Sequence, residues 1–218
     1  MRKPDLTSPT LEASTLKHAI CEDLEEAFRQ IQKPDINLVV CPRVADQFIT
    51  SFIQLVYLSH FHPVSLATNK GLVREQLSEA FSDYIPLYSE GAYRLIEDMV
   101  MLTDLFLKLT QRTQVQLLLQ TVSNDACRKF HVDLYQIRLI CTYDGPGTQW
   151  LPNDQVKREA LGTTNEQITK DLSKIQQMGH FHVGIMKGGQ VHPTSQGVVH
   201  RSPPIMEQGL KRFVFRLD

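Results

Sequence analysis

Apolar residues recur every three or four positions through the first half of the chain, which predicts amphipathic helices buried by one face. The predicted helices cover residues 14–31, 44–58, 72–81 and 92–109. In the second of them Phe48, Phe52 and Val56 form one row that we expect to be buried. A short β-branched run at 36–40, bounded by prolines, predicts a strand.

Beyond about residue 113 the period of the pattern falls from 3.6 to 2, which is typical of strands. Strands are expected at 115–120, 137–143, 181–186, 198–200 and 212–217. The polar stretch 153–178 interrupts them and is interpreted as an insertion. The sequence thus predicts an α+β protein in which helices back a β-sandwich or barrel.

The same patterns suggest how the chain is divided. Residues 1–13 are polar, contain two prolines, and are expected to form a flexible tail. Residues 14–218 are expected to form one domain, with 14–112 as mainly helical support and 113–218 as the β core.

Composition limits the classes of function. The net charge is −1 with no dominant basic stripe, so nucleic acid is not an expected partner. No run of about 18 apolar residues predicts a membrane span. Four cysteines occur without any Cys-x-x-Cys pair, and no secretion signal precedes them. These features favour reduced thiols and a cytoplasmic location. They leave the oligomeric state open.

Candidate chemistry gathers at Phe130-His-Val-Asp133 and at His200. In an extended stretch, His131 and Asp133 point to the same face because they are two residues apart. Two imidazoles and one carboxylate form the facial triad that binds non-haem Fe(II) and leaves positions open for other ligands. The competing interpretation is that Asp133 caps a turn and that His131 is a hydrogen-bonded, half-buried histidine.

Other histidines compete for the metal. His180 and His182 repeat the two-residue spacing, and His192 follows them. None has an adjacent acid and a downstream arginine, so they rank second.

The last predicted strand places Arg212 and Arg216 on one face and Phe213 and Phe215 on the other. A guanidinium binds a carboxylate with two parallel hydrogen bonds, so Arg212 is a candidate anion ligand. The alternative is an edge strand with solvated arginines.

Further candidates lie close to these positions in the sequence. They are Arg138, Tyr143, Thr148, Trp150, Arg201 and Ser202. Arg201 and Ser202 follow His200 and would contact the metal ligands or the substrate, although turn hydrogen bonds before two prolines explain them equally well. Tyr143, Thr148 and Trp150 flank a Gly-Pro-Gly turn and are candidates for a pocket rim or for packing.

With these motifs the β half resembles the cupin-like double-stranded β-helix (jelly roll) of Fe(II)/2-oxoglutarate-dependent oxygenases. In that family a His-x-Asp and a distal histidine hold iron, and an arginine after the histidine holds the far carboxylate of 2-oxoglutarate. His131, Asp133 and His200 stand at the metal positions, and Arg212 lies 12 residues after His200 (212 − 200).

The resemblance implies a metal-dependent dioxygenase of unknown substrate with Fe(II) and 2-oxoglutarate as cofactors. The cofactor-binding residues that it suggests are Arg212, Arg216, Tyr143 and Arg138.

More closely, the stretches 130–133, 142–151 and 200–204 look like a bacterial family of unknown function whose genes often neighbour CobW-type zinc metallochaperones. That resemblance implies two alternatives. One is a non-redox zinc protein of metal homeostasis, and the other is a small-molecule-binding module of the same fold.

Overall fold

The computed structural model describes residues 16–59, 61–84, 89–189 and 196–218. The predicted flexible tail at 1–13 and the rival ligand His192 lie outside these residues. Within them, no helix has the length and apolar content needed to cross a membrane.

A large mixed sheet forms the centre of the described chain. Its seven strands run in the order β1-β2-β8-β5-β10-β4-β3. They are β1 (Lys17–Ile20), β2 (Ile36–Cys41), β3 (Val64–Thr68), β4 (Val115–Val122), β5 (Ile137–Asp144), β8 (Val183–Lys187) and β10 (Arg212–Leu217). Only β1 and β2 pair in parallel, and the other neighbours are antiparallel.

A small antiparallel sheet packs against one face of the large sheet. Its strands lie in the order β7 (Gln176–Gln177), β6 (Gln149–Trp150) and β9 (His200–Arg201). An apolar cluster fills the space between the two sheets: Leu38, Val40, Ile140, Trp150, Met178, Met186, Val198 and Val214. The candidate site lies beside this cluster.

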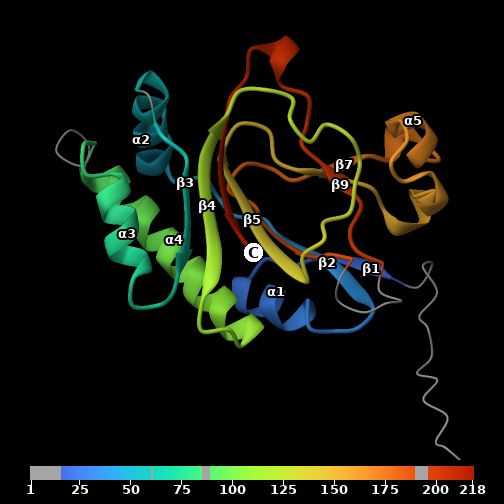
Figure 1. Cartoon of the computed structure of the whole chain (residues 1–218), viewed down its shortest axis with the longest axis horizontal. Coiled ribbons are helices and arrows are strands. Elements are labelled where there is room, and N and C mark those ends of the chain that lie inside the picture. The colour runs from blue at the N-terminus through green and yellow to red at the C-terminus, as the bar shows by residue number, and fades with distance from the viewer. Residues whose placement is uncertain (1–15, 60, 85–88, 190–195) are drawn as a thin grey trace, which may run out of the picture.

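Helices cover the opposite face of the large sheet (Figure 1). They are α1 (Leu24–Gln30), α2 (Gln47–Leu58), α3 (Val73–Ala80) and α4 (Ser89–Thr110). The main apolar core lies between these helices and the sheet and includes Phe52, Phe213 and Phe215. The short helix α5 (Asn165–Ile168) lies on the other side, where Ile168 packs on the outside of the small sheet with Phe130 and Val199.

Strand β10 connects the two cores because its side chains alternate. Phe213, Phe215 and Leu217 belong to the main core under the helices. Arg212, Val214 and Arg216 line the cavity on the other face, as the sequence predicted. The expected α+β layering, with helices packed on the sheet, is therefore confirmed.

Two local predictions were wrong. The segment predicted as one helix over 14–31 contains β1, and α1 begins at Leu24, after Asp23 accepts a hydrogen bond from the Glu26 N–H. Strand β1 forms because its backbone pairs with the distant β2, and this long-range pairing outweighs local helical spacing. Strand β3 was not predicted, although it pairs with β4 along five residues.

One side chain of α2 also differs from expectation. Phe48 was expected in the buried row of α2, but it is 42 % exposed and its ring lies under the Arg94 guanidinium. The 153–178 insertion contains α5, three 3₁₀ turns and β7, and it contributes to the outer cover of the small sheet.

Candidate metal centre and anion pocket

The structure brings His131, Asp133 and His200 together. One ligand atom from each lies within 4.8 Å of the other two, and this is the one group of three or more metal-ligating side chains found among the described residues. His200 Nε2 lies 3.2 Å from Asp133 Oδ2, and His131 Nε2 lies 3.7 Å from Asp133 Oδ1. Ligands that share one ion at bond lengths of about 2.0–2.2 Å stand roughly 3–3.5 Å apart. The donor set therefore suits a single divalent metal, and the His200–Asp133 distance already lies in this range, whereas the other separations are wider.

Backbone pairing sets this convergence. His200 lies on β9 opposite Trp150 of β6, and it also forms an isolated bridge with His131 through two hydrogen bonds of 3.0 Å. The carbonyl of Asp133 accepts a hydrogen bond of 2.8 Å from the Gly189 N–H. The stretch 131–133 is thus an isolated bridge followed by irregular backbone rather than a full strand, yet both predicted ligands reach one point.

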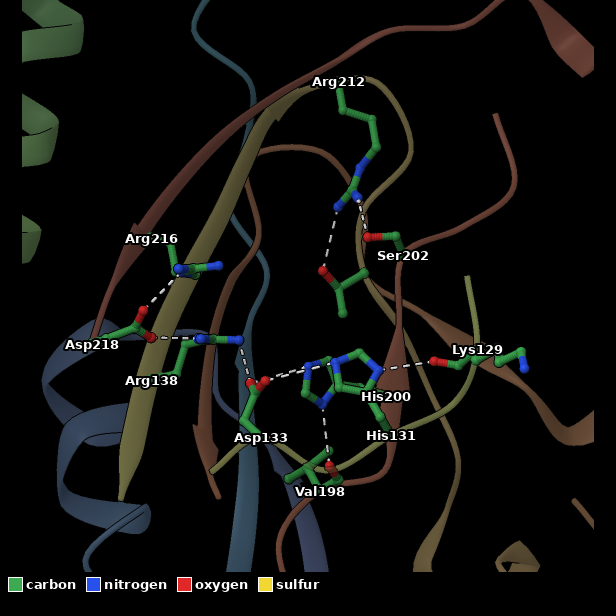
Figure 2. A network of polar contacts seen from close by, with 11 residues as sticks. Lys129, His131, Asp133, Arg138, Val198, His200, Ser202, Arg212, Arg216 and Asp218 are labelled. Carbon is green, nitrogen blue, oxygen red and sulfur yellow. Dashed lines mark hydrogen bonds and ion pairs between the residues drawn. The ribbon is translucent and has the colours of Figure 1, made fainter. Parts of the chain in front are cut away.

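Each imidazole is oriented through its other nitrogen (Figure 2). His131 Nδ1 lies 2.9 Å from the Lys129 carbonyl oxygen, and His200 Nδ1 lies 3.1 Å from that of Val198. A carbonyl only accepts, so each Nδ1 carries the proton and each Nε2 is directed to the carboxylate. This arrangement, in which the outer nitrogen donates to the backbone, is common for metal-bound histidines.

The charges of the trio are coupled. The pKa of His131 is raised, mainly because its imidazole forms a hydrogen bond with Asp133. Burial raises the pKa of Asp133, but hydrogen bonds from both histidines and the charge of Arg138 outweigh it, so that the carboxyl pKa is held well below its usual range. Asp133 is therefore ionised at neutral pH and available as a ligand.

An alternating chain of charges extends from Asp133. Arg138 Nη1 donates to Asp133 Oδ2, and Arg138 Nε donates to Asp218 Oδ1 at 2.5 Å. Asp218 Oδ2 forms an ion pair with Arg216 Nε at 2.9 Å (Figure 2). All four side chains come from the cavity side of the large sheet or the loop that faces it. The sequence suggested Arg138 and Arg216 as cofactor-binding residues, but their direct partners here are carboxylates.

Arg212 has a different environment. It is 2 % exposed, and its guanidinium donates to three hydroxyls: Ser202 Oγ at 3.1 Å, Thr142 Oγ1 at 3.2 Å and Thr148 Oγ1 at 3.4 Å. Its Nε has no partner, and no carboxylate pairs with it among the described residues. Burial lowers the pKa of Arg212 to about 10. A buried cation with no acid beside it is costly unless an anion binds there.

Glycine brings the backbone close to this arginine. Gly145, in the turn after β5, has φ +80°, and a Cβ at this position would collide with the carbonyl of Lys211. Only glycine meets both requirements without strain. The Gly-Pro-Gly turn thus fixes the start of β10, and with it Arg212.

His131, His200 and Arg212 line one cavity of about 110 Å³. Its wall comes from both sheets and from the loop before His131: Leu118, Gln120, Val122, Ala126, Cys127, His131, Arg138, Ile140, Thr148, His200, Arg201, Ser202, Arg212, Val214 and Arg216. Both histidines of the trio thus line the same space as Arg212, and the charged side chains in its wall are all arginines.

Two predicted pocket residues are directed away from the cavity. Tyr143 lies in the main core under the helices, where its hydroxyl donates to Asp98 at 2.5 Å, so its predicted contact with a cofactor in the cavity is wrong. The reason is the alternation of β5, which directs Thr142 to the cavity and Tyr143 away from it. Trp150 packs between the sheets and donates to His18 Nδ1 at 3.1 Å, so it is not at the cavity rim.

Arg201 forms part of the cavity wall, and its guanidinium lies over the Phe130 ring and donates to Gln149. The rival pair is separate from the cavity. His182 Nδ1 accepts from the Gly179 N–H at 3.1 Å, and His180 packs beside Phe181.

Sequence reasoning missed two residues of the site, Thr142 and Asp218. The usable signal was the period of two: Thr142 shares a face with Arg138 and Ile140, and Asp218 continues the row that contains Arg212 and Arg216. No motif marked either residue.

The fold and site thus define a mixed α+β protein that has a His/Asp/His group beside a buried arginine. The model of a family described as "Protein of unknown function (DUF1826)" matches residues 22–218, and the chain belongs to this family. The predicted likeness to a family of unknown function is therefore confirmed, whereas the gene neighbourhood named with it stays a prediction. No curated protein matches the chain in sequence.

Solved structures give weak likenesses. A protein from Shewanella oneidensis described as a candidate oxygenase is 12 % identical with a TM-score of 0.43, and the match covers 93 % of this chain and 89 % of that chain. Full-length Neurospora crassa T7H in complex with alpha-KG is 11 % identical with a TM-score of 0.38, covering 88 % and 76 %. At such low scores and identities we draw no conclusion from them.

Proposed function

We propose that this protein is a metal-dependent dioxygenase of the Fe(II)/2-oxoglutarate type. The observation that carries the proposal is one cavity lined by both histidines of the two-histidine, one-carboxylate group and by a buried arginine, which pairs with no acid in the part of the chain that the structure describes. The first feature alone suits several metals. The second calls for an anion in the same space.

The residues divide into two roles. His131, Asp133 and His200 would hold the metal, with each imidazole kept in place by its Nδ1 hydrogen bond to the backbone. Arg212 would bind the far carboxylate of the oxoacid. When bound, Fe(II) and 2-oxoglutarate would activate O₂, which is the oxidant, because oxidative decarboxylation of the oxoacid to succinate and CO₂ supplies electrons for the reduction of O₂.

The hydroxyls of Thr142, Thr148 and Ser202 hold the Arg212 guanidinium before any anion arrives. A cation that is already oriented loses little entropy on binding, which favours a small dicarboxylate. Hydroxyl partners also leave the positive charge of Arg212 in place, whereas a carboxylate partner would neutralise it.

The finer fold and setting are part of the same proposal. We propose that the two sheets form a double-stranded β-helix, which is supported by the apolar cluster enclosed between them. All four cysteines are free, which supports a cytoplasmic location. The substrate is expected to be a small molecule rather than nucleic acid.

The alternative metal is zinc, because the same ligands bind it well. The test is to purify the protein without oxygen, measure its metal content, and follow 2-oxoglutarate consumption with Fe(II) and with Zn(II). Consumption only with Fe(II) supports the proposal. A protein that holds zinc tightly and neither binds nor consumes 2-oxoglutarate would be a zinc protein instead.

Matched variants connect the chemistry to the site. His131→Ala, Asp133→Ala and His200→Ala should each weaken metal binding strongly, since each removes a ligand and disturbs the other two. His180→Ala is the control because that imidazole is outside the trio. Metal retained in all three variants but lost in the control would place the metal elsewhere.

A further inference from the structure

Asp133 has one partner that a bound metal would not displace. Both histidines reach its carboxylate through Nε2, the atoms that would turn to the ion. Arg138 reaches Oδ2 through Nη1 and has no second donor on Asp133. The Asp133 carboxylate therefore depends on Arg138 for its orientation, and Oδ1 stays free of the guanidinium.

Arg138 is in turn fixed by Asp218. Its Nε donates to Asp218 Oδ1 at 2.5 Å, and its guanidinium lies 4.8 Å from the centre of the Tyr135 ring. The Asp218 side chain is 3 % exposed and also pairs with Arg216. Its backbone exchanges hydrogen bonds of 2.9 and 3.1 Å with Gln116 on β4. Asp218 is thus an anchored carboxylate behind the metal ligand.

Two physical consequences follow from this arrangement. A guanidinium that is free to turn offers two parallel hydrogen bonds to a carboxylate and would occupy both oxygens of Asp133. With Nε committed to Asp218, Arg138 presents only Nη1. The second consequence concerns charge: two acids and two arginines sum to zero, so loss of the Asp218 charge leaves one net positive charge beside a site for a dication.

We propose that Asp218 is a positioning residue of the metal centre. Acting through Arg138, it keeps one oxygen of Asp133 available to the ion and balances the arginine charge. This inference rests on the proposed function only in requiring that the trio bind a divalent metal. It assigns to the end of β10 a role that no motif indicates.

The test uses Co(II) as the probe, because its visible absorption reports the ligand geometry as well as the affinity. Asp218→Asn keeps the size and an acceptor oxygen but removes the charge. We expect it to weaken Co(II) binding by about 10- to 100-fold, as is usual when an outer partner of a ligand is lost, and to shift the absorption bands. Because the positioning effect acts through Arg138, adding Asp218→Asn to Arg138→Met should cause a smaller loss than Asp218→Asn causes in the wild type.

Asp98→Asn is the matched control. Asp98 is also paired with a partly buried arginine, since Arg43 donates to it at 2.6 and 3.0 Å, but it lies on α4, on the helix side of the sheet. Its loss should lower stability without changing the Co(II) spectrum. Asp35→Asn, which breaks a surface pair with Lys17, serves as a second control.

The outcomes are distinct. Wild-type affinity and spectrum in Asp218→Asn, additive losses in the double variant, or an equal loss in Asp98→Asn would each overturn the inference while the proposed function stands. A wild type that binds no divalent metal would remove both. If Asp218→Asn does not fold, Arg138→Lys takes its place in the test, because lysine keeps the charge but cannot bridge the two acids. Wild-type Co(II) binding by Arg138→Lys would overturn the inference.

Discussion

Replacing Arg212 by methionine should separate oxoacid binding from metal binding. The side chain is buried, its three partners are hydroxyls, and none of them is a metal ligand. A hydrogen bond from a charged group is worth about 1.5–3 kcal/mol, which at 1.4 kcal/mol per decade predicts a loss of about 10- to 150-fold in 2-oxoglutarate affinity. Metal affinity should stay within about 2-fold of wild type, because Arg212 makes no contact with the trio.

The same change should have little effect on the ligand-free fold. Methionine removes a buried cation, which is favourable, but leaves three hydroxyls without their donor, which is unfavourable. The two effects oppose each other, so the free energy of unfolding should change by less than about 2 kcal/mol. A folded variant that has lost its ligand is therefore the expected result.

The assay is an anaerobic titration of the Fe(II)-loaded protein with 2-oxoglutarate, followed by its charge-transfer absorption and by calorimetry. Arg158→Met is the matched control. Arg158 is also largely buried, its pKa is lowered to about 10 by burial, and its partners are an amide and a carbonyl rather than an acid. It does not line the cavity. Wild-type binding by Arg212→Met, or an equal loss in Arg158→Met, would refute the assignment of the anion to Arg212.

Two further predictions concern pH and packing. In the metal-free protein the hydrogen bond to Asp133 raises the pKa of His131, so this imidazolium stabilises the fold below the unfolded value of about 6.5 and its contribution is lost as pH rises through the folded pKa. Asp133→Asn should therefore move the NMR titration of His131 to lower pH, and an unchanged titration would contradict the coupling. In α2, Phe52→Ala should cost about 3–5 kcal/mol of unfolding free energy in denaturant titrations, because the ring is fully buried. Phe48→Ala should cost about 1 kcal/mol or less, and equal losses would contradict the burial pattern.

Local pattern predicted the layers of the fold well because helices and inward-facing strands each carry their own period. Strand β10 is the clearest case, since its alternation places Phe213 and Phe215 under the helices and Arg212 in the cavity. Strand β1 could not be predicted in this way. Its residues have helical spacing, and only the pairing of its backbone with β2 makes it a strand.

The convergence of His131, Asp133 and His200 could be predicted because ligand chemistry limits the choice of residues. Few combinations of two histidines and one acid have a suitable spacing, even in a chain with eight histidines. The proposed role of Asp218 could not be predicted, since it depends on two ion pairs that form only when β5 and β10 lie side by side. Tyr143 shows the opposite error, because one step along a strand moves a side chain to the other face.

Trp150 gives the protein an intrinsic optical reporter. It is the only tryptophan in the chain, its backbone pairs with His200, and its indole is held in place by the hydrogen bond to His18. Its fluorescence therefore originates from a single, fixed position next to one of the proposed ligands. An open-shell ion such as Fe(II) or Co(II) quenches a nearby indole, whereas closed-shell Zn(II) does not, so emission from the unlabelled protein distinguishes the two kinds of metal.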